Sequence, residues 1–144
     1  MTRPASRRRA TIALHWSLFL LLICITAGAE HPAFYWAFAL CGAGICALAL
    51  AFGLMGRPGP KLQGAARIAH PWMHRGLYVA IAGVSALCVL HLLTGTPGFL
   101  EMRRATKILF YITMLHAVFH LWRHTALMDG ALRTITPRFI HASL

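Results

Sequence analysis

Four long apolar stretches, separated by short polar segments, set the pattern of this chain. They lie near residues 11–29, 34–55, 75–93 and 107–127. Each stretch is close to the roughly 20 residues that a helix needs to cross the hydrocarbon core of a bilayer. We therefore predict an all-α membrane protein, with a single membrane domain over residues 1–144 folded as an up-down-up-down four-helix transmembrane bundle.

Helix-breaking residues separate the apolar stretches and predict the loops. Glu30-His31-Pro32 ends the first stretch, Gly56 to Pro60 ends the second, and Thr94 to Gly98 ends the third. Proline cannot continue a helix and restricts the residue before it. We expect a short N-terminus, a loop over residues 56–74 and a C-terminal tail, with His74 in the first turn of the third helix, after Pro71.

The composition agrees with a membrane protein. Hydrophobic residues make up 58% of the 144, and only three residues are acidic, which is more apolar than a soluble domain of this size needs to be. The first stretch follows Arg7, Arg8 and Arg9, as the core of a secretory signal would. It is longer than a usual signal core, and cleavage would remove His15, so we interpret it as a transmembrane span.

The cations are distributed unequally over the predicted loops, and this predicts the orientation. Lys and Arg are retained on the cytoplasmic side during membrane insertion. One side carries only Arg103, Arg104 and Lys107, and we therefore expect both termini and the middle loop, on the other side, to be cytoplasmic. The net charge of +11 then reflects loop flanks near anionic headgroups rather than a nucleic-acid-binding face. The cations on the predicted cytoplasmic side are Arg3, Arg7, Arg8, Arg9, Arg57, Lys61, Arg67, Arg75, Arg123, Arg133 and Arg138.

Two of the nine histidines, His15 and His116, lie in the apolar stretches at matching depths. Arg9 and Arg123 are the nearest cations on the same predicted side, and a rise of 1.5 Å per residue places both imidazoles about 9 to 11 Å below that surface. Imidazoles in hydrocarbon face the protein interior or a site, because exposing them to lipid is costly. Two neutral imidazoles on neighbouring helices can take both axial positions of a haem iron, so we predict that His15 and His116 ligate a haem. An interpretation in which each ring hydrogen-bonds to another helix stays open.

His74 and His120 lie closer to the predicted cytoplasmic surface than this pair. We expect them to hydrogen-bond a haem propionate or a quinone oxygen, while iron ligation by either one stays open. Arg75 and the loop cations would neutralise the propionates, or they are solvated positive-inside charges. The histidines expected to be surface groups are His70, His124 and His141.

An ordered set of short motifs resembles the bacterial cytochrome b561 family. It comprises Ala13-Leu14-His15-Trp16, then His74-Arg75-Gly76-Leu77-Tyr78, and finally His116 followed by His124, by Asp129 to Arg133 and by Pro137. The resemblance covers nearly the whole chain. Family members are four-helix inner-membrane b-type cytochromes that usually hold two haems and exchange electrons with quinone, and a related architecture serves as the cytochrome b subunit of hydrogenases and formate dehydrogenases. The resemblance implies that His15 and His116 ligate the cytoplasmic-side haem and that His74 lies near that haem and a quinone region.

The chain departs from the family at the positions of the outer-side haem. Where members carry the two ligands of that haem, this sequence has approximately Phe38 and Met102. Methionine can ligate haem iron, but phenylalanine cannot. His31 and His91 also lie near the outer face as an unorthodox second pair. We nevertheless expect one haem b rather than two.

The expected function is electron transfer in the bacterial inner membrane. The expected partners are membrane lipid, quinone, and a redox partner protein or a larger membrane complex. A haem-free anchor or accessory subunit stays open as an alternative, although it would not need two histidines at equal depth. A metal-ion carrier would normally need carboxylates or discontinuous helices near the midplane, whereas Glu30, Glu101 and Asp129 lie at the boundaries of the spans. A quinone or superoxide oxidoreductase activity at the haem stays open from the resemblance alone.

Overall fold

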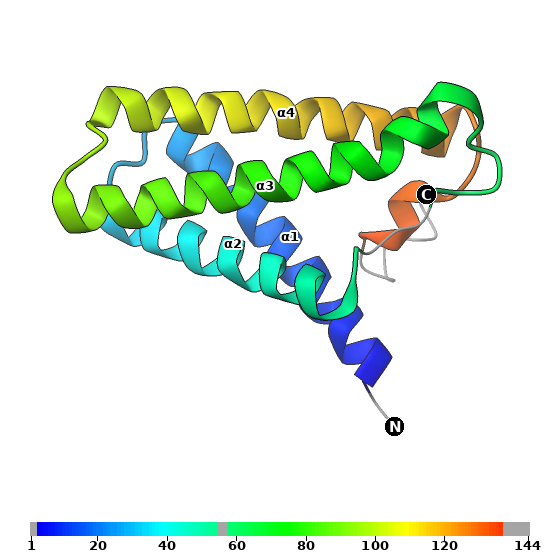
Figure 1. Cartoon of the computed structure of the whole chain (residues 1–144), viewed down its shortest axis with the longest axis horizontal. Helices are drawn as coiled ribbons and strands as arrows, with labels where there is room; N and C mark the ends of the chain where they lie inside the picture. The colour runs from blue at the N-terminus through cyan, green and yellow to red at the C-terminus, as the bar shows by residue number, and fades with distance from the viewer. Residues whose placement is uncertain (1–2, 55–57, 137–144) are drawn as a thin grey trace.

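The computed structural model describes residues 3–54 and 58–136, and the fold is a bundle of four antiparallel helices (Figure 1). All four helices are long and apolar enough to cross a membrane. The prediction of an all-α, multi-pass membrane protein is therefore confirmed. The helices are α1 (Arg3–Thr26), α2 (Pro32–Phe52), α3 (Gly64–Thr94) and α4 (Phe99–Thr125), and a short 3-10 helix, η1 (Ala131–Thr134), follows them.

The helices form a ring in which each one packs against the next and α1 also packs against α4. The contacts of α2 with α1 and α3 are close, whereas those of α4 with α3 and α1 are looser. Figure 1 shows the start of α1, the end of α2, the start of α3 and the end of α4 at one end of the bundle, which we call the terminal end. Toward this end α1 and α2 diverge from α3 and α4, and η1 lies in the opening.

α3 is longer than predicted, which corrects the expected 56–74 loop. Residues 64–74 are helical, so Pro71 lies inside α3, and His74 lies about three turns from Gly64 rather than in the first turn. Hydropathy detects only the part of a helix that is apolar enough for lipid, and the segment before Pro71 includes good helix formers such as Ala65 and Ala66. A proline removes one intrahelical hydrogen bond, which bends a helix without always ending it.

The other helix boundaries differ from the predicted spans for local reasons. α1 starts at Arg3 because its charged first turns continue the apolar helix, and it ends at Thr26, ahead of Gly28, whose φ is 108°. α4 starts at Phe99 rather than at 107, with Glu101 in its first turn, where a carboxylate interacts favourably with the helix dipole. The predicted end of the second span, Met55, lies outside the described residues, as do Arg57, Pro137, Arg138 and His141.

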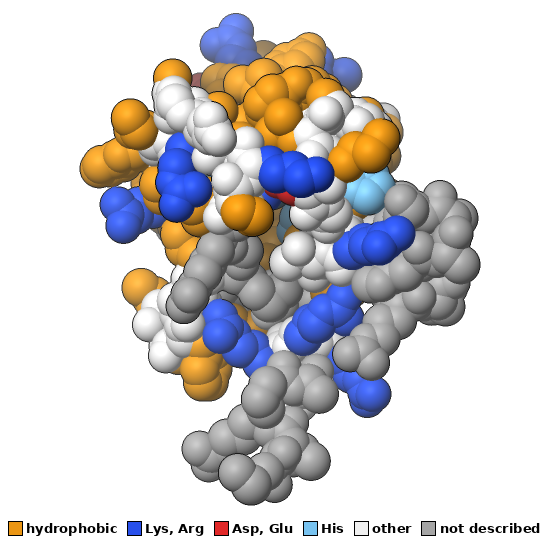
Figure 2. All heavy atoms as spheres, turned by 90° about the vertical axis from the view of Figure 1, so that its right-hand side faces the viewer, with side chains coloured by type: hydrophobic (Ala, Val, Ile, Leu, Met, Phe, Trp, Pro, Cys, Tyr) orange, Lys and Arg blue, Asp and Glu red, His pale blue; other side chains and the backbone are white. Residues whose placement is uncertain are grey.

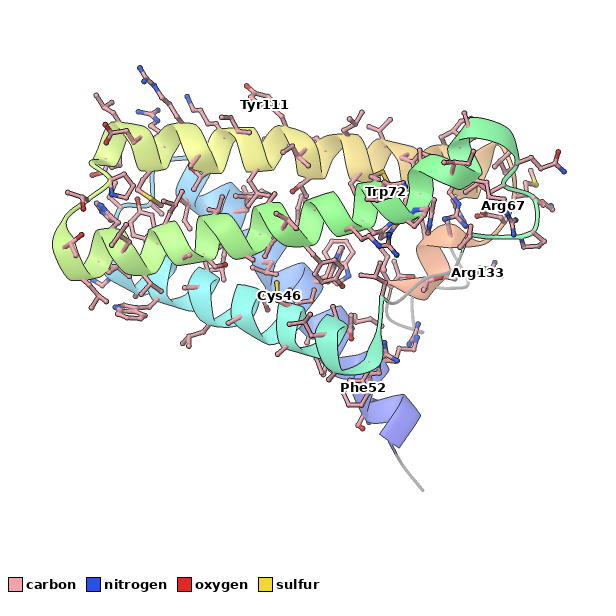
Figure 3. All side chains as sticks on the ribbon, in the orientation of Figure 1. Cys46, Phe52, Arg67, Trp72, Tyr111 and Arg133 are labelled. Carbon is pink, nitrogen blue, oxygen red and sulfur yellow. The ribbon has the colours of Figure 1, made fainter. Side chains whose placement is uncertain are left out.

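Apolar side chains fill the inside of the bundle and also cover its outside. Phe38, Met102 and Leu109 are buried between the helices, whereas Leu50 is 89% exposed. Tyr111 points away from the bundle on the outer side of α4 (Figure 3). This distribution fits a bundle surrounded by lipid, because the lipid tails solvate outward-facing apolar residues.

α2 and α3 pack tightly where Gly42 faces Ser85. A Cβ atom at Gly42 would collide with Oγ of Ser85. Small residues at such crossings let membrane helices approach backbone to backbone. The α2–α3 contact is therefore close, whereas α4 packs more loosely against its two neighbours.

Side chains of α1 hold the segment after α4 against the terminal end. Nη2 of Arg8 donates hydrogen bonds to the carbonyl oxygens of Arg133 and Thr136, both at 3.0 Å. Nε1 of Trp16 donates to the carbonyl oxygen of Ile135 at 3.0 Å. Figure 3 shows Arg133 at this end of the molecule. These bonds join residues more than a hundred positions apart and bring η1 beside the first and last helices.

Candidate functional site

The structure brings His15, His74, His116 and His120 together in the half of the bundle nearer the terminal end. His15 lies on α1, His74 on α3, and the other two on α4. All four line a small cavity of about 80 Å³, and three of them, without His74, also line a larger cavity of about 350 Å³. The predicted pair, His15 and His116, therefore faces a common space.

The larger cavity is apolar and has the size of a small-molecule site. Its volume of about 350 Å³ lies within the roughly 300 to 1,000 Å³ of typical ligand pockets. Leu132 and Ile135, from the segment that α1 holds in place, line it toward the terminal end. A flat, mostly apolar group could contact these walls while its polar atoms meet the histidines. The other apolar residues of the wall include Leu18, Leu22, Phe38, Ile45, Leu77 and Leu109.

His116 is the most constrained ring of the predicted pair. Its side chain is 8% exposed, and its Nδ1 atom is buried without a hydrogen-bond partner among the described residues. A buried polar group without a partner costs about 1 to 3 kcal/mol. His15 is half-buried, and its ring contacts Trp16 edge-on at a centroid distance of 6.1 Å. A group in the cavity that bonds to this Nδ1 atom would offset that cost, so the geometry leaves room for a ligand beside His116.

His74 and His120 meet directly, and His70 joins them. The Nε2 atoms of His74 and His120 are 3.2 Å apart, and Nδ1 of His74 lies 2.7 Å from the carbonyl oxygen of His70. The ring centroids of His70 and His74 are 4.3 Å apart. The expectation that His70 is a surface group is wrong, because its side chain is only 2% exposed. The early start of α3 explains the error, since it places His70 on the same helix face as His74, one turn earlier.

Arg75 is not brought to this cluster. Its side chain is exposed, and its guanidinium lies over the Trp72 ring, 5.2 Å from the centroid. Successive helix positions point in directions about 100° apart, so burial of His74 turns its neighbour toward the outside. Figure 3 shows Trp72 on this part of α3.

A buried ion pair lies beside the cluster instead, and sequence reasoning missed it. Arg123 lines the small cavity, and its Nε and Nη2 atoms lie 2.7 and 2.6 Å from Oδ2 of Asp129. Oδ1 of Asp129 accepts a hydrogen bond from the backbone N–H of Ala131 at 2.9 Å, which orders the start of η1. The sequence did contain a signal for this pair: Asp129, one of only three acidic residues, follows six positions after Arg123 at the end of an apolar helix.

The opposite half of the bundle is densely packed. Met102 is fully buried there, and Phe38, which is 1% exposed, also lines the larger cavity. His31 caps α2 by accepting a hydrogen bond from the N–H of Ala33, and Nδ1 of His91 lies 2.7 Å from the carbonyl oxygen of Pro97. Neither of these histidines lines the two cavities described above.

Cations surround the opening of the bundle at the terminal end. Figure 2 shows this end face-on, with Lys and Arg side chains spread among hydrophobic ones. Arg7 is one of these cations. It donates a hydrogen bond to the carbonyl oxygen of Gly53 at 2.8 Å, and its guanidinium lies over the Phe52 ring. Among the described residues, the half of the molecule that contains His15, His74, His116 and His120 therefore also carries most of the positive charge.

The fold and the site together define a multi-pass helical membrane protein with a buried histidine cluster. No protein-family model matches the chain, and neither the curated proteins nor the solved structures include a match to it. The interpretation of the site therefore depends on its own geometry and chemistry.

Proposed function

We propose that this protein is a membrane b-type cytochrome that holds one haem b between His15 and His116 and carries electrons between a quinone pool and a redox partner. The observation that carries the proposal is that these two imidazoles, from neighbouring helices, line one apolar cavity. Two neutral ligands add no charge to the site, which suits an environment of low dielectric constant. The motifs that resemble the cytochrome b561 family give independent support.

The chain's own residues would position and tune the cofactor. His15 and His116 would hold the iron, and leucine side chains of α1, α3 and α4 would surround the porphyrin and exclude water. The bound haem supplies reversible one-electron transfer. Thr11 and Arg123 line the smaller, more polar cavity, where they would meet propionate or quinone oxygens. Ligand orientation, hydrogen bonding and burial are the means by which a protein sets a haem potential.

The dense packing of the outer half supports one haem rather than two. Met102 is fully buried there, and a second porphyrin would have to displace it, while Phe38 already belongs to the wall of the cavity proposed for the first haem. The charge distribution supports an inner-membrane protein with both termini in the cytoplasm, because Lys and Arg gather at the terminal end. Electrons would then reach the haem through quinone, or through a partner protein that docks near the cytoplasmic surface.

Spectroscopy of the purified protein tests the proposal. Protein expressed in haem-replete cells should give the reduced spectrum of a b-type cytochrome, and a pyridine haemochrome assay should find one haem b per chain. His15→Ala and His116→Ala should each abolish the signal, because each removes an axial ligand. His31→Ala and His91→Ala are the matched controls and should keep it, since neither residue lines the cavity.

Rescue separates loss of a ligand from loss of folding. Added imidazole should restore haem binding to His116→Gly, because it can occupy the space of the missing side chain. Size-exclusion chromatography and far-ultraviolet circular dichroism would verify that each variant keeps its helical fold. A colourless wild-type preparation would refute the proposal and favour a haem-free anchor or accessory subunit.

A further inference from the structure

A second histidine group, formed by His70, His74 and His120, lies beside the proposed haem ligands and shares none of them. One nitrogen of each ring can be chosen so that all three lie within 4.8 Å of one another. α3 supplies two of the rings and α4 supplies the third. Packing of these two helices is thus what assembles the group.

The separation of two of the nitrogens already matches metal coordination. Nε2 of His74 and Nε2 of His120 are 3.2 Å apart. In a tetrahedral zinc site with Zn–N bonds of about 2.0 to 2.1 Å, neighbouring nitrogens are about 3.3 to 3.4 Å apart. Without an ion, one of these two atoms must carry a proton and donate it to the other. An ion that replaces this proton would need only a small change in the distance between these two atoms.

The third ring and its hydrogen bonds complete the donor set. The carbonyl oxygen of His70 can only accept, so Nδ1–H of His74 donates to it, at 2.7 Å, and leaves Nε2 of His74 with a free lone pair. Metal-binding histidines commonly use such a bond to a backbone carbonyl to fix the tautomer and the ring orientation. Nε2 of His70 is buried without a partner among the described residues, on a side chain that is 2% exposed. Nε2 of His70 is therefore the atom of this group that still needs a bonding partner.

We propose that His70, His74 and His120 bind a divalent transition-metal ion, with zinc as the best fit. Three neutral imidazoles suit zinc, copper, iron or nickel better than magnesium or calcium, which prefer oxygen ligands. His74 and His120 also line the small cavity, whose volume of about 80 Å³ can hold a water molecule or two. Three histidines with an accessible fourth position form an open site, as in zinc sites that also bind water or a substrate.

The site lies near the end of a helix that is longer than the hydrocarbon core of a membrane. α3 has 31 residues and is about 46 Å long, which exceeds the roughly 30 Å hydrocarbon core. His70 lies in the second turn of this helix, so it reaches toward the headgroup level at the terminal end. The charge of the nearby Arg123 is compensated by Asp129, which limits its repulsion of a cation.

Zinc titration tests the proposal. The full-length protein, carrying an affinity tag other than polyhistidine, would be stripped with EDTA and titrated with zinc by isothermal calorimetry. One saturable zinc site per chain is expected, and X-ray absorption should show histidine nitrogens at about 2.0 to 2.1 Å. His70→Ala and His120→Ala should each raise the zinc Kd by more than about 100-fold, the most that loss of an outer-shell partner usually costs. His31→Ala is the matched control and should bind zinc like the wild type.

Two further readouts make the outcome decisive. His15→Ala should keep the zinc affinity while it loses haem, so failure of the haem proposal is distinguishable from failure of this one. His70→Gln should bind zinc as weakly as His70→Ala while keeping the wild-type haem content, which shows that the bundle is intact. The proposal is overturned by a wild type without saturable zinc binding, by unchanged affinity in His70→Ala and His120→Ala, or by loss of zinc binding in His15→Ala.

Discussion

Neutralising Asp129 tests the importance of the buried ion pair that joins the end of α4 to η1. In Asp129→Asn the side chain keeps its shape, and its amide oxygen can still accept from the N–H of Ala131. The charge that compensates Arg123 is lost. Both side chains are almost inaccessible, at 5% for Arg123 and 0% for Asp129, so solvent cannot take over this role. Asp129→Asn therefore measures the cost of a buried, unpaired guanidinium, together with an amide NH2 group that replaces Oδ2 as its neighbour.

The expected destabilisation is about 3 kcal/mol. Removing one partner of a buried ion pair costs about 3 to 5 kcal/mol, and the lower end applies because asparagine keeps one hydrogen bond. A loss of about 3 kcal/mol corresponds to an increase of about 150-fold in the unfolding equilibrium constant. Unfolding in mixed micelles with increasing SDS, followed by circular dichroism, measures this constant.

A control and a double variant decide whether the ion pair is responsible. Glu101→Gln removes an exposed carboxylate from the first turn of α4 and should cost less than about 1 kcal/mol. Arg123→Met combined with Asp129→Asn should be more stable than the sum of the single effects by about 2 kcal/mol or more, because neither charge is then stranded. Additive single effects, or a cost of Asp129→Asn no larger than that of Glu101→Gln, would refute the reasoning.

Three other substitutions probe the packing that positions the site. Gly42→Leu should destabilise the bundle by about 1 to 3 kcal/mol in the same SDS assay, because its side chain would collide with Ser85. Gly83→Ala is the control: the added Cβ atom has no neighbour within 4 Å, so the substitution should be neutral or stabilising by up to about 1 kcal/mol. Equal effects of Gly42→Leu and Gly83→Ala on stability would argue against the close α2–α3 contact. Trp16→Phe should lose the hydrogen bond to the Ile135 carbonyl, which is worth about 1 kcal/mol. Amide hydrogen exchange in residues 131–136 should then increase. Unchanged exchange in these residues would show that this bond does not hold η1 in place.

The helices themselves could be predicted from the sequence because hydropathy is a local and cumulative property. About twenty apolar residues suffice to identify a span, whatever the rest of the chain does. The helix ends were less predictable. The polar first turns of α3 and α4 continue the helices beyond the apolar stretches, and Pro71 does not end α3.

The predicted haem pair also came from a local property, the depth of a residue along its helix. His15 and His116 were placed by counting residues from Arg9 and Arg123, and the structure puts both on one cavity. Depth along the axis does not determine the direction in which a side chain points. This is why Arg75 was grouped with the site. The burial of His70 was missed for another reason, the early start of α3.

The sequence by itself thus determined four membrane-crossing helices, the unequal distribution of cations, and two histidines at one depth. Only the tertiary structure decided that His74 and His120, 46 residues apart, lie in hydrogen-bonding distance and that Arg123 pairs with Asp129. These contacts depend on the rotation and tilt of whole helices, which are set by packing at places such as Gly42 and by the bonds from α1 to η1. The hydropathy of a helix hardly depends on how the helix is rotated about its axis. The hydropathy pattern along the chain therefore does not predict which side chains face one another.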